Sequence, residues 1–458
     1  MSEIVGLERY GPFINRYTGN GHLYIDGIED PVPCNLECGQ IVNGRIICQC
    51  SLDSNAVSDP VLLAASSTAQ HAREILGSTS DGFQLQATRL LFKRSSGLQI
   101  TYYAGALSVL EQRDVKIVEL KFRLTNFKFP LTLEWLLDEH FVRIERLENY
   151  DEAIDRLHTI GGAEITALMT VRPSKPIAID KVDQATHIAD DVSMLLTLAR
   201  ACSVQPLVFD AYSKDKRRVT SIHTDMKTTP YCSTPLIDPR NHNDTLEFIQ
   251  QTFNVFRQKN ELWELTRIIR QFIDANDQGG YLESRALKLA VLAESIKSSH
   301  ARLNKKESIL EEKLFNTGID ILKKRLHSSL VEVFPEALTE EIDRMVKHAC
   351  ELNRYSFGEL LQGLITSLRL KVSSSDRYKF VNIRNPLVHE ARFLHADENG
   401  NKRSDTEQWA FMLTFMGRII LAILEYRGHY FSWDLHVRGM SEQARLKMHY
   451  SESAEDAD

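Results

Sequence analysis

The spacing of hydrophobic residues changes near the middle of this chain, and this change constrains the fold more than any other feature. Up to about Asp210, apolar residues recur mainly at every second position, as in a strand with one buried face. From Leu246 onward they recur every three or four residues, as in an amphipathic helix. The sequence therefore predicts an α+β protein in which a β-rich part precedes an all-helical part.

The β-rich part contains several runs of alternating apolar and polar residues, bounded by turn residues. An Asn43-Gly44 pair precedes one such run and is a strong hairpin signal. The predicted elements are strands over Ile46–Cys50, Leu98–Tyr102, Leu120–Leu124 and Leu207–Tyr212, and a short helix over Val192–Ala201. Strands of this kind bury one face, so we expect a sandwich or an open barrel.

The second half of the chain predicts a helix bundle. Ser356 and Glu359 have capping-box spacing, which places a helix start at Ser356. The helical segments are predicted over Leu246–Phe256, Leu262–Phe272, Leu287–Ile296, Ile309–Val333, Ile342–Leu352, Leu360–Leu370 and Asp405–Tyr426.

The segment between the two halves is rich in Thr, Pro, Asn and Asp and has neither period, as expected of a linker. We therefore predict a β-rich sensor or regulatory domain over residues 1–223, a linker over 224–244 and a helical domain over 245–450. The acidic end, residues 451–458, has few apolar side chains and is predicted to be a disordered tail.

The net charge, the longest apolar run and the cysteine content together predict the cellular compartment. The chain has 458 residues and a net charge of −7, which argues against a surface that is cationic all over but permits a local basic cleft. The longest apolar run, 409–424, is interrupted by Thr414 and Arg418, so no membrane span is predicted. Seven cysteines without a secretory signal at the start are typical of reduced thiols, and we expect a cytoplasmic protein.

Four of the cysteines allow a metal hypothesis. Cys34, Cys38, Cys48 and Cys50 would suffice for tetrahedral zinc, but their spacings differ from the usual Cys-x2-Cys knuckles. Cys48 and Cys50 fall on one strand face, where cysteine behaves as a small buried hydrophobic residue. We therefore predict no metal and no cofactor.

One short motif in the helical half combines residues suited to RNA cleavage. Pro386 fits the first turn of a helix, so a helix is predicted to begin there with Asn385 as its cap. Arg384 would then lie beside His389 near a helix N-terminus, where backbone N–H groups favour a phosphate. Three other pairs have similar spacing (Arg16 with His22, and Arg217 or Arg218 with His223), but they lie in the β-rich half.

The chemistry of RNA cleavage by its own 2′-hydroxyl matches this group. The reaction needs a base, an acid and positive charge on the phosphorane. Histidine titrates near neutral pH and can fill either proton role, and a guanidinium can hold phosphate oxygens. We assign phosphate stabilisation to Arg384, the acid or base role to His389, and orientation of the site to Asn385. One chain supplies one such histidine, so a homodimer is expected to supply both.

The sequence here resembles a known family. Arg384-Asn385-x3-His389 is similar to the Arg-x4-6-His motif of HEPN domains, and the helix Glu283–Glu294 and the closing segment Ile420–Phe431 resemble the Apea-like HEPN group. That resemblance implies a dimeric, metal-independent endoribonuclease whose substrate is RNA, such as tRNA or mRNA. It also implies antiphage defence by abortive infection, with a phage-derived or small-molecule trigger at the N-terminal domain.

Two other functional classes fit the same residues. In the first class, the helical half is a non-catalytic HEPN module that binds RNA or a protein. In the other, the β-rich half binds a ligand and the helices only dimerise. The intact Arg384 and His389 favour the enzyme, and fold layout alone does not decide function.

Overall fold

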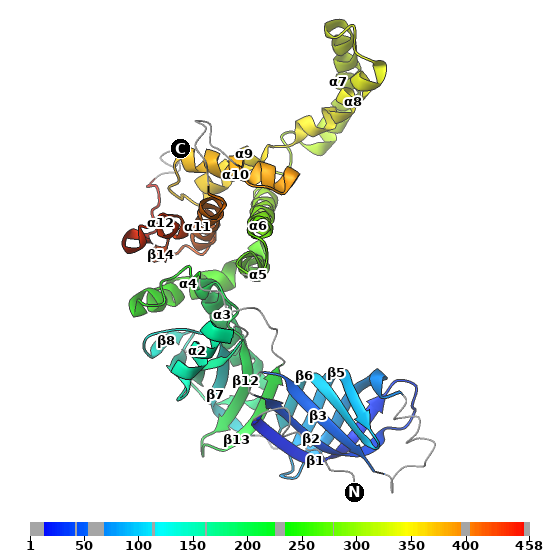
Figure 1. The fold of residues 1–458 in the computed structure, drawn as a ribbon, viewed down its shortest axis with the longest axis vertical. Coiled ribbons are helices and arrows are strands. Elements are labelled where there is room, and N and C mark those ends of the chain that lie inside the picture. The colour runs from blue at the N-terminus through cyan, green and yellow to red at the C-terminus, as the bar shows by residue number, and fades with distance from the viewer. Residues whose placement is uncertain are drawn as a thin grey trace. The chain divides into compact units, whose positions relative to one another are not determined.

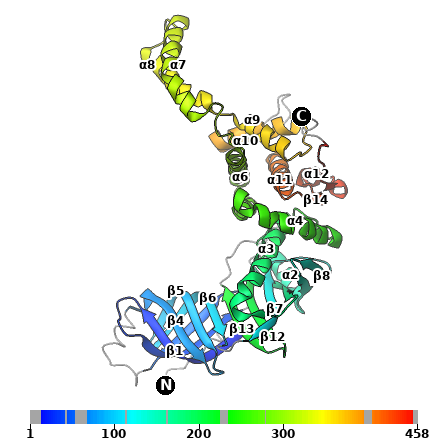
Figure 2. The same ribbon diagram turned by 180° about the vertical axis from the view of Figure 1, so that it is seen from behind.

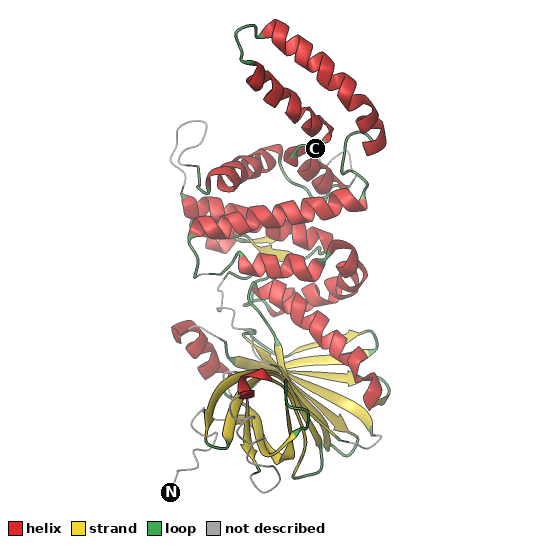
Figure 3. Cartoon of the chain, turned by 90° about the vertical axis from the view of Figure 1, so that its right-hand side faces the viewer, coloured by secondary structure: helices red, strands yellow, loops and turns green. Residues whose placement is uncertain are grey.

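The computed structural model describes residues 13–41, 44–53, 68–111, 115–160, 163–224, 234–277, 279–394 and 404–452, without the side chains of Ile160 and Asp180. The chain divides into two compact units. The first contains the chain up to Asn254, with 276–279 and 428–431; the second contains 255–275, 280–427 and 432–458. Of the described strands, all but β15 (Arg445–Lys447) lie in the first unit, and most of the helices lie in the second, which confirms the α+β class (Figure 3).

The first unit is built on one large antiparallel sheet (Figure 1). Its strands are β1 (Phe13–Ile25), β2 (Val32–Ile41), β3 (Ile46–Leu52), β4 (Ala72–Thr79), β5 (Gln84–Ser96), β6 (Gln99–Leu110), β7 (Lys116–Thr125), β8 (Leu133–Leu137), β9 (His140–Arg146), β10 (Ile165–Pro173), β11 (Ile177–Ala178), β12 (Pro206–Ser213) and β13 (Arg218–Thr224). The strands predicted over 46–50, 98–102, 120–124 and 207–212 are all present. Asn43, of the predicted hairpin turn, lies outside the described residues.

Strands β1 to β6 close into a barrel, so the prediction of a sandwich or an open barrel was wrong. The order β3-β2-β1-β4-β5-β6 returns on itself because β3 also pairs with β6, from Ile46 opposite Ala104 to Ser51 opposite Gln99. Closure satisfies the backbone groups that an open edge would expose. The interior is filled by apolar side chains, among them Leu23, Ile75 and Tyr102, so this part of the barrel is a packed core.

Glycines on β1 and β4 let these two paired strands approach each other closely. A Cβ atom at Gly19 would lie 2.0 Å from the carbonyl oxygen of Ser78, and one at Gly77 would lie 2.5 Å from that of Asn20. No side chain fits at either position, which is the usual meaning of glycine inside a strand. The barrel therefore needs glycine where β1 meets β4.

Strand β6 is shared between the barrel and the rest of the sheet. Its first half pairs with β3, and its second half, Ala106–Leu110, pairs with β13. From β13 the sheet continues through β12, β7, β10, β9 and β8. Figure 2 labels β13, β12, β7 and β8 of this part. Two helices belong to this part, α2 (Tyr150–Ile160) and α3 (Val182–Arg200). The short helix predicted over 192–201 is the second half of α3, which begins ten residues earlier.

Arg200, at the end of α3, fixes the segment that precedes the first long helix. Its guanidinium is buried and donates to the carbonyl oxygens of Lys128 and Ile237 and to the hydroxyl of Thr245. Residues 225–233 of the predicted linker lie outside the described part, and its last residues are helical because α4 begins at His242. The two compact units divide within α4, after Asn254.

The helical segments follow the predicted order. They are α4 (His242–Trp263), α5 (Leu265–Asp274), α6 (Leu282–Leu303), α7 (Glu312–Val333), α8 (Thr339–Lys347), α9 (Phe357–Ser367), α10 (Ser374–Glu390), α11 (Asp405–Ile423) and α12 (Trp433–Val437). The predicted start at Ser356 is confirmed: its hydroxyl accepts from the Glu359 amide at 3.2 Å, and the Glu359 carboxylate accepts from the Ser356 amide at 2.8 Å. Of the predicted acidic tail, 453–458 lies outside the described residues.

Helix α11 is the centre of the helical unit. It is apolar on nearly all sides, and 15 of its 19 residues are buried. Helices α6, α10 and α12 pack against it. Within the described residues, no helix reaches the length and apolar character that a membrane crossing requires. Helix α11 forms the core of this unit and holds α6 and α10 in place for the site described next.

Candidate functional site

Arg384, Asn385 and His389 all lie on α10, but the helix does not begin at Pro386. It begins at Ser374, with the hydroxyl of Ser373 accepting from the Asp376 amide at 3.0 Å, and runs through Pro386 to Glu390. The predicted helix start was therefore wrong, and Asn385 is an interior residue rather than a cap. The motif lies in the last turns of α10, so helix N-terminal amides do not form a phosphate site there.

Arg384 is held firmly against α6 and α9. Its Nη2 donates to the Glu294 carboxylate of α6 in a short ion pair, and its guanidinium lies 4.6 Å from the ring centre of Phe357. Only 12% of the Arg384 side chain is exposed. Lys297 also binds Glu294, at 2.5 Å, so one carboxylate links two cations. A guanidinium fixed by a carboxylate and an aromatic face points in one direction.

His389 is exposed near the end of α10, and Asn385 is exposed one turn earlier. The amide oxygen of Asn385 accepts from Arg384 Nη1 at 3.1 Å. His389 is five positions after Arg384, which on a helix is about 7.5 Å along the axis and about 140° around it. Within the described residues no hydrogen bond joins these two side chains, so a single chain does not bring them together as the sequence predicted.

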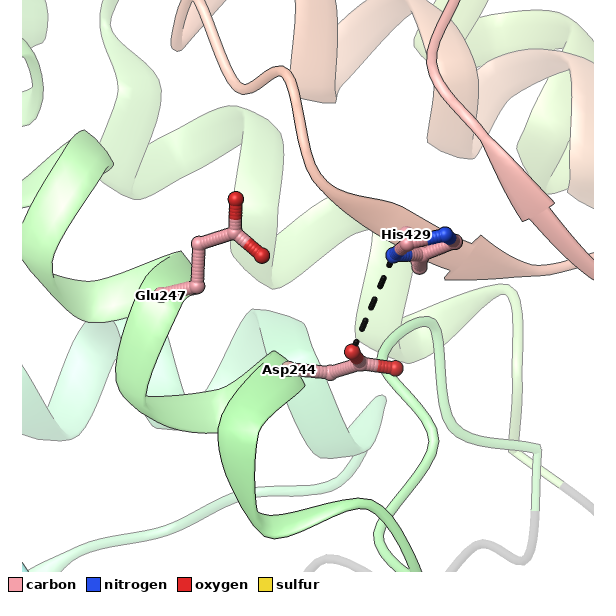
Figure 4. A group of neighbouring side chains, drawn as sticks. All are labelled: Asp244, Glu247 and His429. Carbon is pink, nitrogen blue, oxygen red and sulfur yellow. Dashed lines mark ion pairs between the residues drawn. The ribbon is translucent and has the colours of Figure 1, made fainter.

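A second group of chemically capable side chains lies in the β-rich unit. Asp244 and Glu247 occupy the first turns of α4, and His429 comes from β14 (His429–Phe431) (Figure 4). One ligand atom from each lies within 4.8 Å of the others, and no other such group occurs in the described ranges. The set has the nitrogen and oxygen donors that zinc or manganese accepts. However, Asp244 Oδ1 and His429 Nδ1 are 3.9 Å apart, and an ion pair between them also explains the arrangement.

The four cysteines considered for zinc line the barrel interior as two pairs. Cys38 lies opposite Cys48 on β2 and β3, and Cys50 is hydrogen-bonded to Cys34. All four are buried. The hydrogen bond to Cys48, and then burial, raises the pKa of Cys38 well above its usual value, and the bond to Cys34 and burial do the same for Cys50. Among the described residues, these four thiols do not form a group of three or more ligand atoms as close together as a metal ion requires. Their packing in the barrel core is that of small buried hydrophobic residues.

Sequence reasoning missed Glu294 as the partner of Arg384 and missed the Asp244, Glu247 and His429 group. Glu294 is 90 residues from Arg384, and no local pattern links them. The spacing of Asp244 and Glu247 puts them on one helix face, but nothing local indicates that His429 joins them.

Comparison with known proteins adds no relative. No family model matches the sequence, and neither the curated proteins nor the solved structures contain a match.

Proposed function

We propose that this chain is a metal-independent endoribonuclease of the HEPN type, acting through Arg384 and His389. The observation that supports the proposal is the state of Arg384: its guanidinium is held by Glu294 and Phe357, and 12% of its side chain remains exposed. A fixed guanidinium can stabilise the charge of a phosphorane, and the exposed Asn385 and His389 lie on the same helix, with His389 facing another direction from Arg384.

The proposed reaction uses a nucleophile that RNA itself provides. A base removes the proton of a ribose 2′-hydroxyl, the 2′ oxygen attacks the phosphorus, and an acid protonates the departing 5′ oxygen. The products are a 2′,3′-cyclic phosphate and a free 5′-hydroxyl. His389 takes one proton role, Arg384 neutralises the phosphorane, and Asn385 orients Arg384 through its amide oxygen.

Two copies of the chain complete the site. Attack and departure lie on opposite sides of the phosphorus, so base and acid are needed on opposite sides as well. Arg384 and His389 point in different directions from α10, and a twofold axis beside this helix presents the same patch twice. We propose a homodimer in which each phosphate meets His389 of both chains.

The test is RNA cleavage by purified full-length protein in EDTA, with tRNA and mRNA as substrates. His389→Ala and Arg384→Ala are each expected to lower the rate by about a hundred- to ten-thousandfold. Arg267→Ala and His327→Ala are the matched controls, since both residues are exposed ion-pair partners on helices other than α10. Activity that disappears in EDTA and returns with Mg²⁺ or Mn²⁺ would overturn the mechanism.

A mixed dimer tests the composite site directly. If one phosphate needs both histidines, a dimer of one normal and one His389→Ala chain is nearly inactive. If one histidine suffices, the same dimer keeps about half of the activity, since it retains one of two sites. Full activity from a monomer at working concentration would contradict the shared site.

A non-catalytic HEPN module is the second candidate, and one observation favours it. Arg384 is mostly buried and already ion-paired, as expected of an arginine that only joins α10 to α6. RNA binding without cleavage, unchanged by His389→Ala, would support this alternative. The enzyme is preferred because His389 is exposed and therefore accessible to a substrate. In a bacterial cell we propose that cleavage is controlled by the β-rich half and limits phage growth.

A further inference from the structure

A polar cavity of about 140 Å³ opens at one end of the barrel. There β13 replaces β3 as the neighbour of β6, and the first residues of β1 have no partner on the β4 side. The gap between β1, β13 and the β4–β5 turn is the cavity. Its walls include Arg16 and Tyr17 from β1, Ser80 from the turn, and Arg218, Thr220 and Ser221 from β13.

A buried hydrogen-bond network fixes the back wall. The Gln40 amide nitrogen donates to the carbonyl oxygens of Gly44 and Thr224, so its oxygen faces Nδ1 of His223 at 3.0 Å. Nδ1 must therefore carry a proton and donate it to that oxygen. Burial, and then the charges of Arg218 and Arg123, lowers the pKa of His223 to about 3, so the ring is neutral and Nε2 accepts.

The hydroxyl of Tyr17 donates to that Nε2, at 3.1 Å. The hydroxyl of Ser221 donates to Asp210 at 2.6 Å. Both hydroxyls thus have partners behind the wall, and the ring of Tyr17 is held with the Arg218 guanidinium 5.7 Å from its centre. The wall is preformed by side chains that pack on one another, before any ligand binds.

Two hydrogen-bond donors on β13, the Thr220 hydroxyl and the Arg218 guanidinium, lie outside this network. Thr220 is 3% exposed, lines the cavity, and its hydroxyl has no hydrogen-bond partner in the described residues. An unsatisfied buried hydroxyl destabilises a folded protein unless something else satisfies it. Arg218 contacts Asn15 at 3.3 Å and Asp210 at 3.9 Å through Nη1, which leaves donors on Nε and Nη2.

From this geometry we propose that the cavity binds a small oxyanion, phosphate or the phosphate group of a larger ligand. Arg218 supplies the charge, and the Thr220 hydroxyl supplies a hydrogen bond that it otherwise lacks. A 140 Å³ cavity is similar in size to one that holds a benzene-sized molecule, so one phosphate group fits. Asp81 at the rim is exposed, and water screens its charge. The proposal is independent of RNA cleavage.

The experiment measures thermal unfolding of the full-length protein with sodium phosphate, against sodium chloride at the same ionic strength. Phosphate is expected to raise the unfolding midpoint, and chloride is not. Thr220→Val is the decisive variant because it keeps the shape and removes only the unpartnered hydroxyl. It is expected to leave the midpoint without phosphate unchanged or higher, yet to weaken phosphate binding by about tenfold.

Arg218→Gln is expected to abolish the phosphate effect. Arg217→Gln is the matched control, since Arg217 is the neighbouring arginine, pairs with Glu111 and does not line the cavity. It should retain the full effect. The proposal would be overturned if phosphate raised the unfolding midpoint of Thr220→Val and of Arg218→Gln as much as that of the unmodified protein. It would also be overturned if neither phosphate nor AMP raised the midpoint of the unmodified protein.

The two sources of the oxyanion are separated by titrating inorganic phosphate and AMP into the same protein. Similar affinities for both identify the free ion as the ligand. AMP binding that is at least about tenfold tighter, and is lost in Thr220→Val, identifies the phosphate group of a larger ligand. Both results support the oxyanion site, because both require the same two residues of β13.

Discussion

Lowering the pH from 7 to 5 is expected to destabilise the β-rich unit through His223. This side chain is fully buried, bonded to Gln40 and Tyr17, and faces Ser221, Arg218 and Arg123. Its folded-state pKa is about 3, whereas the usual value is 6.5. At a pH between these two pKa values, the unfolded chain binds a proton that the folded chain does not. The free energy of unfolding therefore falls as the pH falls.

The size of the loss follows from the distance below 6.5. At pH 5 the unfolded histidine is 1.5 pH units below its pKa while the folded one remains neutral, which costs about 2 kcal/mol at about 1.36 kcal/mol per unit. The loss would continue to grow down to about pH 3. Two carboxyl groups on α3 act in the opposite direction: burial raises the pKa of Asp190, and burial and the Asp190 charge raise that of Asp191 to about 6.

A comparison with His223→Gln separates these effects, because the carboxyl contributions are the same in both proteins. The assay is urea unfolding at pH 7 and pH 5, read locally by hydrogen exchange of β13 peptides and corrected for intrinsic exchange rates. A local readout is needed because the chain has two compact units, and two-state unfolding is expected only of single domains. The unmodified protein should lose about 2 kcal/mol more than the variant. Equal losses would refute the argument, and His223 would then be protonated without cost in the folded protein.

Two further predictions concern the helical unit. Pro386→Ala is expected to stabilise α10 by about 2 kcal/mol, because it restores a backbone donor to the carbonyl of Asn382 and removes a ring from the helix interior. The measurement is hydrogen exchange in α10, which should become slower in the variant. Faster exchange would contradict the prediction. Ser356→Ala is expected to cost about 1 kcal/mol by removing one half of the capping box of α9, whereas Ser375→Ala, inside α10, should change stability much less in the same urea titration.

The sequence was sufficient for features that depend on near neighbours. Alternation located β6 and β7, and the spacing of Ser356 and Glu359 located the start of α9. Barrel closure was beyond reach, because it depends on β3 meeting a strand that lies some fifty residues away, and strand alternation is the same in an open or a closed sheet.

The error at Pro386 has a local cause. Proline is tolerated in the first turn of a helix and disfavoured in its interior, so the motif suggested a start where α10 in fact continues. The true start was visible in Ser373-Ser374-Ser375-Asp376, where a serine cap precedes an acidic residue by three positions. The ion pair of Arg384 with Glu294 required tertiary packing of α10 on α6, which no short segment encodes.

The double use of β6 determines where this protein can be divided. A fragment that ends after β6 would keep the closed barrel but would leave the Ala106–Leu110 half of the strand without β13 along one side. That half would then present bare amide and carbonyl groups, which other chains can pair with and which promote aggregation. A fragment that begins after β6 would leave β13 exposed in the same way. The barrel and the outer sheet are therefore expected to survive proteolysis or domain exchange only together.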